Sequence, residues 1–305
     1  MKADLIYSLL VDPLNGEALL PDESGLKAVS VSGTSSYEII EGVPQIVTGN
    51  SNIIRSSELH ENQHSIFNYT EHYQADAGLF DYSEEYESPA TRHEIRRVHE
   101  SILKEIHGAN CSILDVGCGN GWAAAALVPK GHRVVSMDIS TKNPVDSLKR
   151  TDHVNHAAVT ADVYNMPFRE ETFDYIIASE IMEHVPDPGL FIQCLLKVLK
   201  REGKLIITTP YNEKIEYCLC VHCNRKTPMH AHLHSFNEKN ISALIPADGL
   251  TYKTNKFSSK YLARLHSHVV LKYFSFSFWQ LADSCFLFLF GKAMRFKIII
   301  TPGKV

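Results

Sequence analysis

The sequence predicts an α/β protein in which a parallel sheet is covered by helices on both faces. Between residues 111 and 209, apolar strand-like runs alternate with helix-like segments, which is the pattern of repeated βαβ units. The first run ends in a glycine-rich turn, Gly117-Cys118-Gly119-Asn120-Gly121, and the next two runs end at Asp138 and Asp162. Because ligands of such sheets bind at the carboxyl ends of the strands, these residues indicate a ligand site at one edge of the sheet.

The composition is that of an ordinary globular protein. A chain of 305 residues is long enough for one large domain and one small one. The net charge of −5 argues against a general nucleic-acid binder. Seven cysteines are an odd number without the spacing of a disulfide framework, and the first residues lack the pattern of a signal peptide. We therefore expect a reduced, cytoplasmic protein.

The chain divides into three parts by pattern. Residues 1–48 are predicted to form a small β-rich accessory domain, because strand-like runs at 37–40 and 43–47 flank a turn. Residues 49–110 contain a polar, aromatic-rich segment and then a helix that starts at Pro89 and places apolar residues at 3.6-residue spacing. The ligand-binding core follows at 111–305, with an insertion at 210–236.

Within the core, the order of elements follows from local signals. Strands are expected at 113–116, 133–138, 157–161, 173–178, 204–209, 250–257 and 296–301. Asp187 and Pro188 predict the start of a helix, and Gly203 is expected to end it.

Three stretches resemble class I S-adenosylmethionine (SAM)-dependent methyltransferases of the type 11 (UbiE-like) kind. Residues 114–121 (LDVGCGNG) resemble the first motif of that family, 161–168 resemble the third, and 179–188 (SEIMEHVPDP) resemble the segment after the fourth strand. The resemblance implies a Rossmann-like sheet of seven strands with an antiparallel last strand. It also implies SAM as the cofactor, held by Asp115, Gly117, Cys118, Gly119, Asn120, Gly121, Asp138, Ile139, Asp162, Val163 and Glu180.

The same resemblance suggests roles for the segments before the core. In that family the stretch preceding the core often closes over the cofactor, so Tyr73, Phe80 and Tyr82 are candidates for a lid, with a plain linker as the alternative. Residues 1–48 resemble the short zinc-ribbon-like activators of methyltransferases but contain no cysteine, which excludes a cysteine-ligated zinc there. Packing, substrate positioning and a stabilising cap remain alternative roles for this segment.

The insertion carries two candidate sites. Cys220, Cys223, His230 and His232 offer enough soft ligands for a tetrahedral zinc, and the alternative is a loop with free thiols. His184, His232 and His234 fall near the predicted rim of the sheet, where a neutral histidine can take a proton as a methyl group is transferred.

Residues 269–290 are very apolar, but Asp283 and the return to a last strand argue against a membrane span. Core packing or a homodimer face is one interpretation, and peripheral membrane contact or a wall for a lipid substrate is the other. Together these observations predict a SAM-dependent methyltransferase acting on an oxygen or nitrogen atom of a small-molecule, glycan-linked or lipid-linked substrate. The alternatives are an RNA or protein methyltransferase and a non-catalytic scaffold with the same fold. A dinucleotide-dependent dehydrogenase is disfavoured, because the glycine spacing is G-x-G-x-G.

Overall fold

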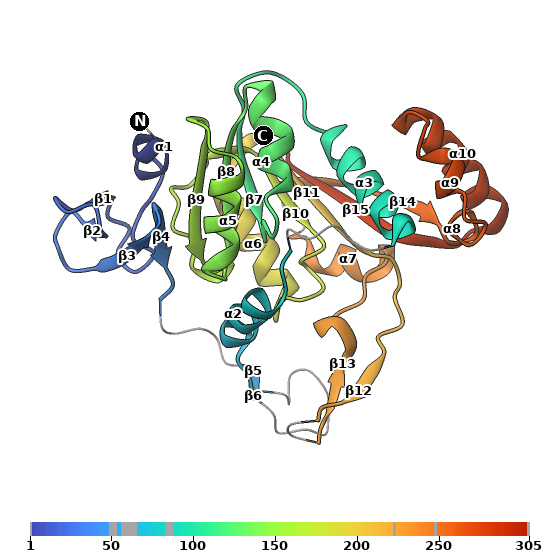
Figure 1. Ribbon diagram of the computed structural model, residues 1–305, viewed down its shortest axis with the longest axis horizontal. Helices are drawn as coiled ribbons and strands as arrows, with labels where there is room; N and C mark the ends of the chain where they lie inside the picture. Colours follow the sequence, from blue (N-terminus) through green and yellow to red (C-terminus); the bar gives the residue numbers. More distant parts are fainter. Residues whose placement is uncertain are drawn as a thin grey trace.

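The computed structural model describes residues 2–48, 54–55, 66–82, 88–221, 224–246 and 249–303. Its centre is one eleven-stranded sheet in the order β1-β2-β3-β4-β9-β8-β7-β10-β11-β15-β14 (Figure 1). The seven strands from β9 to β14 correspond to the predicted core sheet. They are β7 (Ser112–Val116), β8 (Arg133–Asp138), β9 (His156–Ala161), β10 (Phe173–Ser179), β11 (Leu199–Pro210), β14 (Leu250–Ser259) and β15 (Ala293–Pro302).

The direction of these strands confirms the predicted Rossmann-like arrangement. β9, β8, β7, β10 and β11 pair in parallel, whereas β15 runs antiparallel to both β11 and β14. Parallel strands bring all their carboxyl ends to one edge, and the turns after β7, β8, β9 and β10 therefore meet there.

Helices cover both faces of the sheet. They are α3 (Pro89–Leu103), α4 (Trp122–Leu127), α5 (Lys142–Arg150), α6 (Pro188–Val198), α7 (Glu238–Leu244), α8 (Lys260–Arg264), α9 (His268–Leu271) and α10 (Phe276–Phe290), with short 3₁₀ turns at Val128–Lys130, Val163–Asn165 and Met229–Ala231. Alternate strand residues enter opposite cores: Leu114 packs in the cluster that includes α6, and Ile113 packs in the cluster that includes α3, α4 and α10.

The start of α6 agrees with its capping signal, and its end does not. The Asp187 side chain accepts a hydrogen bond from the Leu190 backbone N–H (2.9 Å), as expected for the cap of α6. However, α6 ends at Val198, and β11 begins at the next residue. Gly203 lies inside β11, so the prediction that it ends the helix is wrong. A Cβ at Gly203 would lie 2.9 Å from the carbonyl oxygen of Lys200, which explains why the strand needs glycine here.

The N-terminal segment extends the central sheet. It contains α1 (Lys2–Tyr7), β1 (Leu19–Pro21), β2 (Lys27–Ser30), β3 (Ser36–Ile40) and β4 (Val43–Ile46). β4 pairs in parallel with β9 through Gln45 opposite Thr160 and Ile46 opposite Ala161. The buried side chain of Ile46 belongs to the same hydrophobic cluster as β7. The division into an accessory domain, a lid segment and a core stays a prediction.

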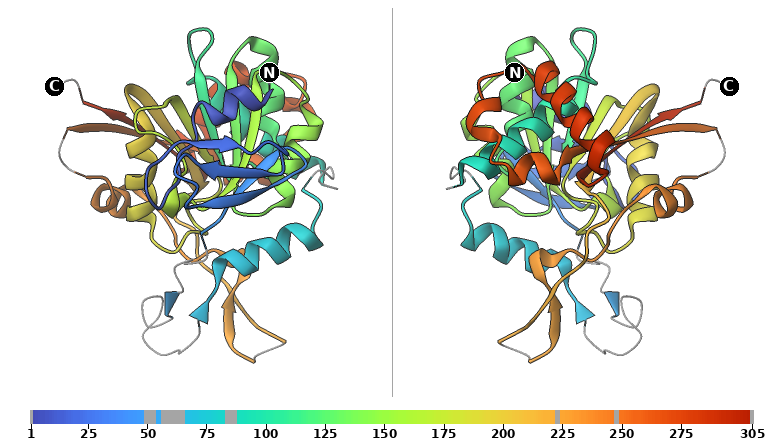
Figure 2. Two further views of the ribbon diagram at one scale, coloured as in Figure 1. Left: turned by 90° about the vertical axis from the view of Figure 1, so that its left-hand side faces the viewer. Right: turned by 90° about the vertical axis from the view of Figure 1, so that its right-hand side faces the viewer.

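Two further features project from the edge that carries the strand ends. The hairpin β12 (Tyr217–Leu219) and β13 (Lys226–Pro228) lies beside α2 (Tyr69–Leu79) and the short pair β5 (Ile54–Arg55) and β6 (Ile66–Phe67), as all views show (Figures 1 and 2). α8, α9 and α10 lie at the opposite end of the sheet from β1–β3 (Figure 1). Within the described part of the chain, the longest apolar helices are too short to cross a bilayer.

The apolar stretch 269–290 is only partly a core element. Of the residues of α10, Trp279 and Asp283 are buried, while several large apolar side chains of this stretch are exposed. Core packing therefore accounts for one face of this helix and leaves the other in solvent.

Candidate functional site

The glycine-rich turn after β7 has a backbone that only glycine fits at two positions. Gly117 has φ +67°, and a Cβ there would lie 2.3 Å from the Ile181 side chain. Gly121 has φ +71°, and a Cβ there would meet the Ser147 hydroxyl at the same distance. The Gly117 N–H donates to the carbonyl of Met137 (2.8 Å), which ties the turn to the end of β8. Packing thus fixes this turn from both sides.

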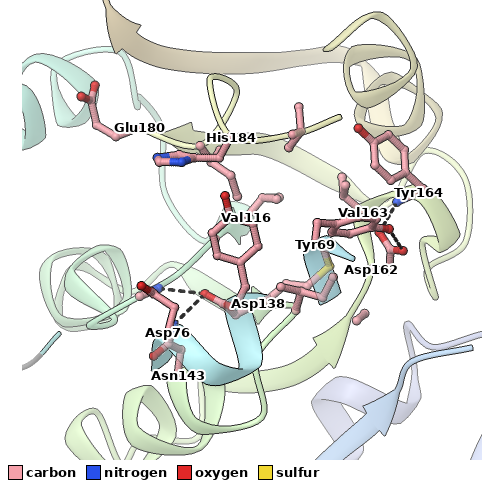
Figure 3. Close-up of a pocket in the computed structure, with 18 of the residues that line it drawn as sticks. Tyr69, Asp76, Val116, Asp138, Asn143, Asp162, Val163, Tyr164, Glu180 and His184 are labelled. Atoms are coloured by element: carbon pink, nitrogen blue, oxygen red, sulfur yellow. Dashed lines mark hydrogen bonds between the residues drawn. The ribbon is translucent and has the colours of Figure 1, made fainter. Parts of the chain in front are cut away.

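Gly119, between these two, faces open space. Its φ is +46°, and a Cβ there would have no atom within 4 Å. Its N–H donates to Asp138 at the end of β8 (3.3 Å), and Asp138 also accepts from the Ser140 N–H (2.9 Å) and the Asn143 side chain (3.1 Å) (Figure 3). The Asp138 carboxylate therefore connects the turn after β7 to the turn after β8.

Asp162, at the end of β9, stands on the other side of the same space. It is buried and accepts hydrogen bonds from the Tyr69 hydroxyl and from the Tyr164 N–H (3.0 Å) (Figure 3). Burial raises the pKa of Asp162, an effect that these hydrogen bonds partly offset. A buried carboxyl with acceptor capacity left is suited to a polar ligand group that donates.

A cavity of about 210 Å³ lies between these residues. Seven of the predicted cofactor residues line it: Gly117, Gly119, Asp138, Ile139, Asp162, Val163 and Glu180. The other four predicted residues, Asp115, Cys118, Asn120 and Gly121, are not among the lining residues. They shape the turn instead, since Asp115 and Cys118 are buried in the protein and Asn120 accepts from the Trp122 N–H (3.2 Å).

Asp115 is a buried acid whose ionisation is unfavourable. Burial, and secondarily the charge of Asp138, raise its pKa from 3.8 to about 7, and its Oδ2 has no hydrogen-bond partner. Between these two pH values the folded protein binds a proton that the unfolded chain releases, so the carboxyl makes the fold less stable as pH rises toward 7.

Asp115→Asn should remove this penalty. The variant should unfold at nearly the same urea concentration as the wild type at about pH 4 and become the more stable protein by roughly 4 kcal/mol above about pH 7. Urea unfolding of both proteins over this pH range measures the difference. If the free energies of unfolding of the two proteins changed in parallel with pH, the ionisation of Asp115 would not destabilise the fold.

Helix α2 closes one side of the cavity. The cavity is lined by Tyr69, Tyr73 and Asp76 of this helix and by Tyr82, which follows the helix. The Gln74 side chain fixes the helix to the loop after β8, because it donates to the Ile139 carbonyl (3.0 Å) and accepts from the Thr141 N–H (3.1 Å). Of the three predicted lid residues, Tyr73 and Tyr82 border the cavity, whereas Phe80 is 62% exposed and does not.

Two rim histidines come together beside this cavity. The ring of His184, which lines the cavity, lies 4.8 Å from the ring of His232 between centroids. Burial lowers the pKa of His184 to about 4, so its ring is neutral near pH 7, and its Nδ1 is buried without a partner. His234 lies apart from this pair and contacts the Pro186 carbonyl through Nε2 (3.1 Å).

His232 is held by a carboxylate. Its Nδ1 lies 2.5 Å from the Glu213 Oε2. The two residues before it, His230 and Ala231, both have positive φ (58° and 53°), a strained conformation for side chains that is common at functional sites. A carboxylate on Nδ1 orients the ring and leaves Nε2 as the basic nitrogen.

A group of potential metal ligands includes this pair. One ligand atom each of Glu183, His184 and His232 lies within 4.8 Å of the others. Glu183 is buried, accepts from the Thr209 hydroxyl (3.0 Å) and has a pKa raised by burial. Carboxylate and imidazole ligands suit a divalent transition metal. Of the predicted zinc ligands, His232 belongs to this group, Cys220 and His230 do not, and Cys223 lies outside the described residues.

Some lining residues have no signal in the sequence. Tyr69, Asp76 and Asn143 come from helices whose sequence gives no hint of a ligand. Glu180 was predicted, but its ion pair with Arg295 of β15, far along the chain, was not. Glu180 has φ +54°, so the backbone after β10 is strained where it meets the cavity.

The comparisons with known proteins concern the part of the chain that carries this site. Residues 114–207 match the family model described as a methyltransferase domain. The chain is 37% identical over 119 residues to the mitochondrial ubiquinone biosynthesis O-methyltransferase of Bos taurus, a match that covers 35% of this chain and 30% of that protein. It is 29% identical over 134 residues to the ubiquinone biosynthesis O-methyltransferase of Hydrogenovibrio crunogenus, covering 42% of this chain and 55% of that protein.

Among solved structures, the fold is similar to Haemonchus contortus phosphoethanolamine N-methyltransferase 2 in complex with S-adenosyl-L-methionine. The TM-score is 0.52 at 18% identity, over 75% of this chain and 57% of that chain. At this identity the similarity concerns the fold alone. The chain covers 30% of the length of the first of these relatives and 55% of the second, so the similarity is one of domains. Residues 114–207 of this chain thus match a methyltransferase domain, within a fold similar to that of a methyltransferase solved with S-adenosyl-L-methionine.

Proposed function

We propose that this protein transfers the methyl group of SAM to a hydroxyl oxygen of a small-molecule acceptor. The observation that carries the proposal is the cavity in which Gly119, Asp138 and Asp162 meet at the ends of three neighbouring strands. A fold alone does not imply an activity, so the chemistry of these side chains has to support the proposed methyl transfer.

We assign each part of SAM to one region of this cavity. Asp138 accepts from the ribose hydroxyls, as an acid at the end of the second strand does in nucleotide-binding sheets. Asp162 accepts from the adenine amino group, and the rings of Tyr69 and Tyr164 border that end of the cavity. The open space beside Gly119 leaves room for the aminocarboxyl group against backbone N–H groups. Bound SAM supplies a methyl group on a positively charged sulfur.

In this proposal His232 is the residue that takes the proton of the acceptor. As the acceptor hydroxyl oxygen gained the methyl group that bound SAM would supply, its proton would pass to Nε2 of His232. Glu213 holds the ring and stabilises the positive charge that it gains. Neutral His184 and the lid tyrosine Tyr73, whose rings are 6.1 Å apart between centroids, exclude water and align the acceptor.

The relatives favour oxygen over nitrogen as the acceptor atom, because their names are those of O-methyltransferases. An acceptor linked to a glycan or a lipid fits the same chemistry. We also propose a cytoplasmic location, as expected from the sequence.

Calorimetric titration of the purified protein with SAM tests the cofactor assignment. We expect saturable binding of SAM, no binding of NAD, and an affinity about tenfold weaker for Asp138→Asn, which loses one charge-assisted acceptor. Asp174→Asn is the matched control, since Asp174 lies at the amino end of β10 and pairs with Lys200 away from the cavity. Binding of NAD, or equal SAM affinity in Asp138→Asn and wild type, would overturn the assignment.

A further inference from the structure

The helix α10 presents apolar side chains to solvent at helical spacing. Phe278, Leu281, Cys285 and Phe288 follow one another along α10 at intervals of three, four and three residues, and Phe274, just before the helix, stacks on Phe278 with ring centroids 4.5 Å apart; all five are exposed. Leu281 is 63% and Phe288 91% exposed. We call these five residues the outer face. A surface helix of a globular protein normally presents polar residues on that side, so the outer face is suited to an apolar partner.

The opposite side of the helix is anchored in the protein. Trp279 is buried, with Arg97 of α3 stacked over its ring at 5.4 Å. The buried Asp283 carboxylate accepts from the backbone N–H groups of Ser258 (2.9 Å) and Ser259 (2.5 Å) at the end of β14. The outer face is therefore rigidly attached to the sheet and is not a frayed terminus.

The segment of the chain that carries the outer face is cationic. The segment 260–292 contains four lysines and arginines, Lys260, Arg264, Lys272 and Lys292, and all four are exposed. Its one acid, Asp283, is buried, although the whole chain carries a net charge of −5. Lys272 and Lys292 lie over the rings of Tyr273 (4.9 Å) and Tyr261 (5.7 Å). Aromatic rings beside lysines are the side chains that favour the boundary between lipid headgroups and acyl chains.

We propose that the outer face docks on the surface of an anionic lipid bilayer, with α10 lying in the plane of the interface. The apolar side chains enter the acyl boundary, and the four cations contact the headgroup phosphates. α8, α9 and α10 form one end of the molecule, away from the N-terminal strands, so no other described element covers this surface (Figures 1 and 2). A symmetric contact between two copies is disfavoured, because it would bring two sets of like charges together.

Vesicle co-sedimentation of the full chain tests this inference. The probes are vesicles of phosphatidylcholine and phosphatidylglycerol in equal parts, and vesicles of phosphatidylcholine alone. We expect the protein to sediment with the mixed vesicles and to bind the neutral ones at least tenfold more weakly. The double variant Leu281→Asp with Phe288→Asp should bind the mixed vesicles more than about tenfold more weakly, because it places two charges in the acyl boundary. Lys272→Glu and Lys292→Glu should each reduce binding about fivefold.

Matched controls test whether the effect is local. Leu14→Asp changes an exposed leucine of the N-terminal turn, and Lys239→Glu changes an exposed lysine on α7; both should bind vesicles like the wild type. SAM affinity measured by calorimetry should be the same in every variant, which shows that each one is folded. Equal vesicle binding by the outer-face variants and the wild type would overturn the proposal. So would a dimer in light scattering that the Leu281→Asp and Phe288→Asp changes dissociate, because the face would then join two copies.

Discussion

Gly119→Trp should weaken SAM binding by a factor of at least one hundred. Gly119 lines the cavity, has φ +46° and has no atom within 4 Å of the position of a Cβ. An indole ring placed there would fill space that the cofactor needs in a cavity of about 210 Å³. Calorimetric titration with SAM measures the loss.

The same substitution at a distant glycine is the control for backbone strain. Gly33 has φ +74° in the turn between β2 and β3, and a Cβ there would also have no atom within 4 Å. Gly33→Trp therefore introduces comparable left-handed strain but no obstruction of the cavity, and it should bind SAM like the wild type. If both variants lost SAM binding equally, strain and not occupancy of the cavity would be the cause.

His232→Gln should lower kcat by about two to four orders of magnitude, which is the usual contribution of a positioned general base. Glutamine retains hydrogen bonding to Glu213 but has no basic nitrogen. The assay follows transfer of a labelled methyl group from SAM to a panel of phenols, catechols and aliphatic alcohols. SAM affinity should stay unchanged, because the change removes a proton acceptor and not a cofactor contact.

Two controls separate a base from other roles of His232. His230→Gln changes the exposed neighbouring histidine, whose ring lies 5.9 Å from that of His232, and should leave kcat within a factor of about two. A chelator should leave the wild-type rate unchanged if His232 acts as a base alone. Loss of activity that is restored by added metal would instead assign His232 to a metal site with Glu183 and His184.

The predictable parts of the site are the residues that lie at the end of a strand in the local sequence pattern. The turn 117–121 and the acids Asp138 and Asp162 each follow a strand directly, so the parallel sheet alone brings them to one edge. The contacts of α2 were not predictable in this way. Tyr69 reaches Asp162 across 93 residues, and no periodic stripe or cap marks the tyrosine as a partner.

Helix ends and exposed faces were the other limits of prediction. Gly203 carried a strong signal for a helix end, but the close approach of the Lys200 carbonyl within β11 requires glycine just as strictly. A glycine suits a helix end and a crowded strand position equally well, so the local sequence did not distinguish the two. Tertiary packing decided between them. Likewise, the sequence showed that residues 269–290 are very apolar, and only the structure showed that Phe278, Leu281 and Phe288 point away from the core.

The pairing of β4 with β9 determines which strand forms the outer edge of the sheet. In the seven-stranded core, β9 would be an outer strand with unpaired N–H and C=O groups, a template for association between chains. The N-terminal strands occupy the end of β9 at Thr160 and Ala161 and continue outward to β1, which is only three residues long. The segment thus pairs with the end of β9 that leads into the cavity, and the outermost strand on this side of the sheet is the short β1.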